Sequence, residues 1–136
     1  MSEKNNKSEI RKSYLLNKYV IITPGRAKRP RDVKEETIIK RTSGCPFCFD
    51  NIDKSNITDT IKNKDKNWEV VSIKNIFPAV TLDNNKAYGT QEVIIETADH
   101  TTELGELPVE HIEKILKIYA KRTKKIAENK KIDYIL

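Results

Sequence analysis

Two cysteines, Cys45 and Cys48, are the residues whose type and spacing most directly indicate chemistry. They are the only cysteines in the chain, and two residues separate them. Two thiolates at this spacing can bind one tetrahedral zinc ion from a single tight turn. A redox pair, or two ordinary buried thiols, would have the same spacing. The pair alone therefore leaves all three interpretations open, because two ligands do not complete a zinc site.

A basic segment lies upstream of the cysteines. Residues 26–31 carry four basic side chains in six positions, and Pro30 favours an extended backbone. One guanidinium group can bind two phosphate oxygens at once, and it keeps its charge. A solvated basic loop would have the same composition. The segment is thus a candidate phosphate site, with the solvated interpretation left open.

Length and composition favour one soluble domain. The chain has 136 residues, of which 34% are charged, and its net charge is +6. That charge suits an anionic partner, although many scattered lysines only keep a surface soluble. Residues 1–12 lack the apolar run of a signal peptide, and no run is long enough to span a membrane. Two cysteines without such a signal suggest a reducing compartment, so we expect a cytoplasmic protein.

Hydrophobic periodicity predicts an α+β fold. We expect an antiparallel, twisted sheet with one helix, residues 108–128, packed on a face. Residues 1–12 are expected to be a flexible lead-in to a domain spanning 13–136, and residues 50–67 a polar loop. The strands are expected at residues 19–22, 68–73, 91–97 and 132–136.

The last predicted strand, residues 132–136, runs to the end of the chain. Because natural chains usually end in a tail or a completed element, we expect a truncated piece of a longer protein. Such a piece would expose a sheet edge and part of an apolar face, so we also expect poor solubility or self-association.

Five short motifs follow one another along the chain. They are Arg11 with residues 19–22, residues 26–30, residues 45–48, residues 75–79, and residues 92–97 with Asp99 and His100. In this order they resemble the N-terminal half of galactose-1-phosphate uridylyltransferase, a member of the histidine-triad superfamily. Another sugar-1-phosphate nucleotidylyltransferase would share most of them.

The resemblance implies a histidine-triad fold and a two-step transfer of UMP. In that family a histidine attacks the α-phosphorus of UDP-glucose, and galactose 1-phosphate then takes the UMP from the uridylyl-histidine intermediate. The implied partners are a UDP-hexose and a hexose 1-phosphate, and the full-length enzymes commonly work as homodimers. The implied cofactor is zinc.

The resemblance also assigns roles to single residues. It implies that Cys45, Cys48 and His100 are zinc ligands. It implies that Arg26 and Arg29 bind the phosphates of the nucleotide sugar. Asn75 and Phe77 match residues at the uridine site, where an amide can bind ribose or base and an aromatic ring can pack on the base.

Two departures from the family pattern stand out. Ile76 replaces a frequent aspartate, which removes a possible acceptor for a sugar hydroxyl. The family's nucleophile lies in a His-Pro-His stretch, but this chain has only two histidines, His100 and His111, and neither is in such a stretch. We therefore expect no turnover by this chain alone, and we expect His111, in the first turn of the helix, to be solvated.

Two further classes of function remain as alternatives. A small zinc module that binds nucleic acid would fit the positive charge, but the chain lacks a second CxxC or a close histidine pair and has few aromatic residues. We therefore do not expect nucleic acid as a partner. A thiol redox protein is disfavoured because a polar loop, rather than a helix, follows Cys48.

Overall fold

A computed structural model describes residues 7–28 and 45–136 of the chain. These residues form two compact units. Among the described residues, unit 1 comprises 7–28 and 75–91, and unit 2 comprises 45–74 and 92–136. The second segment of unit 1 is therefore an insertion in the sequence of unit 2.

Unit 1 contains a two-stranded antiparallel hairpin. Its strands are β1 (Glu9–Lys12) and β2 (Tyr19–Ile22), and a 3-10 helix, η1 (Pro24–Lys28), follows. The β-branched residues of β2 favour a strand, and Thr23-Pro24-Gly25 after it favours a turn. The strand predicted at 19–22 is confirmed. The partner strand β1 lies in the segment expected to be a lead-in, so residues 9–12 are an ordered part of this unit.

The inserted segment, residues 75–91, is held to the hairpin of unit 1 by hydrogen bonds. The amide of Ile10 donates to the carbonyl of Lys86 at 2.9 Å, and Asn84 Nδ2 donates to the carbonyl of Ser8 at 2.6 Å. Within the segment, Gly89 is buried, and a Cβ at this position would lie 2.8 Å from Val80 Cγ2. A glycine is required at this position because the backbone and Val80 approach so closely.

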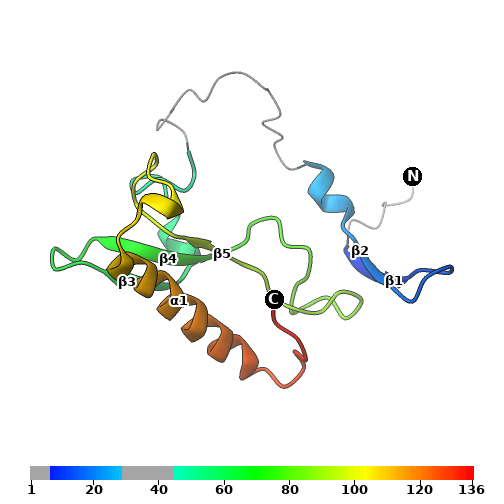
Figure 1. Cartoon of the computed structure of the whole chain (residues 1–136). Helices are drawn as coiled ribbons and strands as arrows, with labels where there is room; N and C mark the ends of the chain where they lie inside the picture. The colour runs from blue at the N-terminus through cyan, green and yellow to red at the C-terminus, as the bar shows by residue number, and fades with distance from the viewer. Residues whose placement is uncertain (1–6, 29–44) are drawn as a thin grey trace. The chain divides into compact units, whose positions relative to one another are not determined.

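Unit 2 is a three-stranded antiparallel sheet with one helix on a face (Figure 1). The strand order is β3-β4-β5, and α1 contacts β3 and β4. Short 3-10 helices, η2 and η3, precede β3 and α1 respectively. The bounds are η2 Lys54–Asn56, β3 Ile57–Lys62, β4 Trp68–Lys74, β5 Glu92–Ile95, η3 Leu104–Glu106 and α1 Val109–Ala127.

The core of unit 2 is small and apolar. Val70 from β4 is fully buried against Ile115 and Ile118 from α1, and Ile61 and Ile94 pack on this group. Ile115 and Ile118 have helical spacing, Pro108 is the N-cap, and lysines lie in the last turn. These features explain why α1 forms where it does. The predicted helix 108–128 is confirmed.

A polar network lies between the helix and the sheet in unit 2. Arg122 of α1 donates two hydrogen bonds to the carboxylate of Glu92, at 2.8 and 2.7 Å. The hydroxyls of Ser72 and Thr58 donate to the same carboxylate at 2.8 and 3.2 Å. Burial disfavours the charge of Glu92, but the bonds from Arg122, Ser72 and Thr58 outweigh it and lower its pKa.

The α+β class and the antiparallel sheet with a packed helix are confirmed, but three predicted details are wrong. The predicted strand at 19–22 pairs in a separate sheet, and residues 57–62, expected to be loop, form β3. Residues 132–136 are not a strand, because no described residue pairs with them and a strand exists only through such pairing. The strand predicted at 91–97 is shorter, Glu92–Ile95, and the 68–73 strand is confirmed.

Among the described residues, none of the helices combines the length and the apolar character needed to cross a membrane.

Candidate functional site

The cysteine pair sits in a compact turn of unit 2. The amide of Cys48 donates to the carbonyl of Cys45 at 3.3 Å, and Asn51 Nδ2 donates to that carbonyl at 2.8 Å. The Asn51 amide in turn donates to the carbonyl of Cys48 at 2.9 Å. The next residue, Phe49, stacks on Trp68 of β4, with ring centroids 5.6 Å apart. The turn is therefore fixed by its own backbone bonds and by a contact with the sheet.

His100 lies in the turn that follows β5 in unit 2. The Asp99 carboxylate accepts hydrogen bonds from the amide and hydroxyl of Thr101, at 2.7 and 2.9 Å, and from the Thr102 amide at 3.3 Å. These bonds lower the pKa of Asp99 and order the turn. His100 Nδ1 lies 3.2 Å from Cys48 Sγ.

The structure thus brings Cys45, Cys48 and His100 together. One ligand atom from each lies within 4.8 Å of the others. Partial burial raises the pKa of Cys48, and the neighbouring Cys45 and Asp50 add to the shift. A divalent cation would favour the thiolate form, and two thiolates with one imidazole form a donor set that fits zinc.

His111, the other histidine, is not part of this group. It is half-buried in the first turn of α1, and its Nε2 donates to the carbonyl of Glu96 at 2.7 Å. The expectation that His111 is solvated is therefore wrong. Its imidazole instead ties the start of α1 to the chain just after β5.

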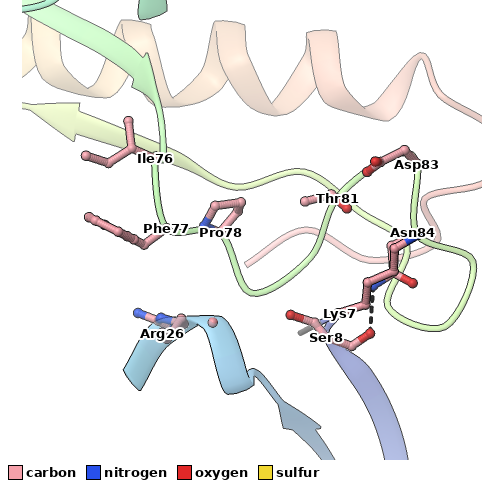
Figure 2. Close-up of a pocket in the computed structure, with 10 residues that line it drawn as sticks. Lys7, Ser8, Arg26, Ile76, Phe77, Pro78, Thr81, Asp83 and Asn84 are labelled. Carbon is pink, nitrogen blue, oxygen red and sulfur yellow. Dashed lines mark hydrogen bonds between the residues drawn. The ribbon is translucent and has the colours of Figure 1, made fainter. Parts of the chain in front are cut away.

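A cavity of about 340 Å³ opens in unit 1 (Figure 2). One part of its lining is apolar and aromatic, from the turn that begins the inserted segment, and Arg26 of η1 faces this turn in the close-up. The other part is polar and carries both signs of charge. The described lining residues are Lys7, Ser8, Gly25, Arg26, Ile76, Phe77, Pro78, Thr81, Asp83 and Asn84.

Of the four residues predicted to bind substrate, the structure places two in this cavity, Arg26 and Phe77. Asn75 is not among the described residues that line it. The side-chain oxygen of Asn75 accepts a hydrogen bond from the Phe77 amide at 2.9 Å, so it shapes the turn that presents the ring. Arg29 lies outside the described residues.

The polar end of the cavity was not predicted from the sequence. A hydrogen bond from Thr81 lowers the pKa of Asp83, and the charge of Lys7 lowers it further, so this carboxylate is ionised at neutral pH. The polar residues from Asp83 to Ala87 predict only a turn, as such residues usually do. The sequence gives no local signal that Lys7 lies near Asp83, because more than seventy positions separate them.

A comparison with protein families identifies the family of this chain. Residues 28–136 match the family described as "Domain of unknown function (DUF4931) N-terminal domain". The chain belongs to this family.

Two curated proteins are similar to the chain. An ADP-glucose phosphorylase of Arabidopsis thaliana is 30% identical over 98% of this chain and 43% of its own length. A galactose-1-phosphate uridylyltransferase of Thermotoga maritima is 22% identical over 93% of this chain and 39% of its own length. The chain thus spans about two fifths of the length of the curated relatives that it matches.

Solved structures show the same relationship. The crystal structure of an Arabidopsis thaliana ADP-glucose phosphorylase with bound ADP-glucose matches with a TM-score of 0.59 and 29% identity, covering 94% of this chain and 41% of that one. A GALT-like protein from Arabidopsis thaliana matches with a TM-score of 0.59 and 27% identity, covering 69% of this chain and 33% of that one. The chain therefore shares its fold with these two proteins over the parts that match.

Proposed function

We propose that the chain is the nucleotide-binding part of an enzyme that transfers a nucleotidyl group between a nucleoside diphosphate sugar and a second phosphate-bearing substrate. The observation that carries the proposal is the cavity of unit 1, in which Arg26 and the aromatic ring of Phe77 line one space. A guanidinium suits a diphosphate, and an aromatic ring suits a base. Both relatives have names that refer to sugar nucleotides or sugar phosphates.

We propose roles for four residues of this chain from the family resemblance and, for Arg26 and Phe77, also from the cavity that they line. Arg26 would neutralise phosphate charge, and Arg29 is proposed to assist it on the strength of the family resemblance. Phe77 would pack on the base, and the amide nitrogen of Asn75 would be the group left to bind ribose or base, since its oxygen is engaged with the Phe77 amide. Neither histidine of the chain is proposed as the nucleophile, which would come from a segment outside these residues.

Zinc is the metal proposed for Cys45, Cys48 and His100. When bound there it would act as a structural cross-link, tying the cysteine turn to the turn after β5 in unit 2. Its contribution is therefore proposed to be stability and ordering of these two turns rather than activation of a substrate.

The base is proposed to be adenine, with uracil as the second candidate. The ADP-glucose phosphorylase is similar at 30% identity, whereas the uridylyltransferase is similar at 22%. Ile76, which is 66% exposed, adds an apolar side chain beside Phe77 in the cavity and suits the larger apolar face of a purine. Uracil is kept as the second candidate because the uridylyltransferase relative matches 93% of this chain.

Calorimetric titration of the chain tests the proposal. We expect saturable binding of ADP-glucose, weaker binding of UDP-glucose, and a loss of roughly tenfold or more in affinity for Arg26→Ala, because a charged hydrogen bond to phosphate is lost. Arg11→Ala is the matched control, since Arg11 is exposed on β1 and does not line the cavity. Equal affinity of both variants, or equal binding of any polyanion such as an oligonucleotide, would refute the proposal.

A further inference from the structure

The turn that carries Phe77 is bracketed by hydrogen bonds to one residue, Gln91. The amide of Asn75 donates to the main-chain oxygen of Gln91 at 3.0 Å. The amide of Ala79 donates to the side-chain oxygen of the same residue, Oε1, at 2.9 Å. Between these two bonds the Phe77 amide donates to Asn75 Oδ1, and Pro78 has no amide hydrogen to donate.

Gln91 does not line the cavity itself. It is half-buried at the far end of the inserted segment of unit 1, and three of the residues it brackets, Ile76 to Pro78, line the cavity. Figure 2 shows these three side chains on one short stretch of the ribbon. Gln91 therefore contacts the backbone of the aromatic wall and does not reach the space where a ligand would lie.

We propose that Gln91 is a positioning residue for nucleotide recognition: its side-chain oxygen fixes residues 75–79 so that Phe77 is held in place before the base arrives. The proposal rests on the function proposed above. A segment that is already ordered loses less conformational freedom on binding, so fixing it increases affinity without adding a contact to the ligand.

The chemistry of the bond explains why glutamine suits this position. The Ala79 amide needs an acceptor, because a part-buried amide without a partner is costly. A glutamine oxygen is neutral and can rotate to face the donor, while asparagine is one methylene shorter. Glutamate also offers an oxygen at this reach, and leucine has a similar size but no acceptor.

The first arm of the test measures the bond without a ligand. Uniform ¹⁵N labelling with sequential assignment lets hydrogen exchange be followed at the Ala79 amide, which donates to Gln91 Oε1. We expect the Ala79 amide to be protected from hydrogen exchange in the natural chain and in Gln91→Glu, and to lose protection about tenfold or more in Gln91→Leu and Gln91→Asn. An Ala79 amide that exchanges equally fast in all four proteins would overturn the proposal.

The second arm measures binding of ADP-glucose by calorimetry. We expect Gln91→Leu and Gln91→Asn to weaken binding roughly five- to tenfold, and Gln91→Glu to restore most of it. Zinc stoichiometry of unit 2 and the circular dichroism spectrum should stay unchanged, which separates this effect from general unfolding. Unchanged affinity in Gln91→Leu, with exchange protection lost, would show that the fixed turn does not aid recognition.

The two arms also separate this proposal from the function on which it rests. If the natural chain fails to bind ADP-glucose and UDP-glucose, the proposed function fails, and the recognition role of Gln91 fails with it. If the natural chain binds and the Gln91 variants bind equally well, only the role of Gln91 fails.

Discussion

At the scale of single residues, the least exposed ion pair among the described residues joins Glu92 and Arg122. Their side chains are 10% and 16% exposed, and the contact is bidentate. Removing one partner of such a pair leaves the other charge buried without compensation. This pairing was not predicted, because residues thirty positions apart give no local sequence signal of it.

We expect Arg122→Met to destabilise the fold by roughly 3 kcal/mol, because Glu92 would then lose its charged partner. The double variant Glu92→Gln/Arg122→Met should be less unstable than Arg122→Met alone. The matched control is Lys117→Met, since Lys117 and Glu113 form a surface pair in which both side chains are 63% exposed. Urea unfolding measures the differences, and equal losses for Arg122→Met and Lys117→Met would contradict the assignment.

The carboxylate of Glu92 makes the free energy of unfolding depend on pH. The pKa of Glu92 is lowered below its ordinary value of 4.5 in the folded chain. Its ionisation therefore stabilises the fold above about that pH, and this contribution is lost as the pH falls through the lower folded value. We expect the free energy of unfolding to fall between about pH 6 and about pH 3 by less in Glu92→Gln than in the natural chain. Parallel pH profiles would show that Glu92 does not carry this dependence.

At the scale of elements, a helix or strand was predicted correctly where its sequence signal lies within one short window. The helix was predicted within one residue of Val109–Ala127, because its apolar spacing, Pro108 and terminal charges all lie in one window. Strand β2 was predicted from its β-branched run, and β4 likewise. In contrast, β3 was missed because its isoleucines and threonines lie among many polar residues, although they are β-branched residues that favour strands.

For the candidate sites, the residue types were predictable and their supporting contacts were not. The sequence motifs named the cysteine pair and His100, which the structure brings together, and two of the cavity residues, Arg26 and Phe77. The contacts that order these groups, such as Asn51 to the Cys45 carbonyl, join side chains to backbone across turns and leave no periodic pattern.

The inserted segment of unit 1 offers a sharp test of close packing. We expect Gly89→Ala to destabilise the chain by about 1–3 kcal/mol, because the new Cβ would lie 2.8 Å from Val80 Cγ2 and the φ of +158° is unfavourable for other residues. Gly105→Ala is the control, since a Cβ there meets nothing within 4 Å. Val80→Ala combined with Gly89→Ala should recover part of the loss. Thermal unfolding measures each variant, and equal shifts for the two glycine variants would contradict the packing argument.

At the scale of the whole molecule, a bound metal would join distant parts of the sequence. Cys48 and His100 are 52 residues apart in the chain. We expect zinc at about 100-fold above its Kd to raise the melting temperature by about 5 °C or more, because an ion that binds only the folded state stabilises it.

Calcium should produce no such shift, because it prefers oxygen ligands, and Cys48→Ser should abolish the effect of zinc. Trp68 provides a second measurement. It is the only tryptophan and stacks on Phe49 beside the cysteine turn, so its fluorescence should change on zinc binding. A melting temperature and a fluorescence spectrum that zinc leaves unchanged would refute the metal site.

Self-association and a homodimer of the full-length protein stay predictions. The hairpin of unit 1 exposes several large apolar side chains, among them Tyr14, Leu15 and Tyr19, which are 104%, 93% and 66% exposed. Exposed apolar groups favour association. Sedimentation velocity over a range of concentrations measures it, and a single monomeric species throughout would contradict the expectation.

The chain leaves unit 2 before the inserted segment and returns to it afterwards at two paired positions, which is useful for protein engineering. Lys74 at the end of β4 pairs directly with Glu92 at the start of β5. A two-residue turn such as Asn-Gly can connect paired positions of this kind. Replacing residues 75–91 by that turn would convert β4 and β5 into an ordinary hairpin and leave the strand register unchanged. The sheet, the helix and the cysteine-histidine group would then form a minimal module, into which other binding loops could be grafted.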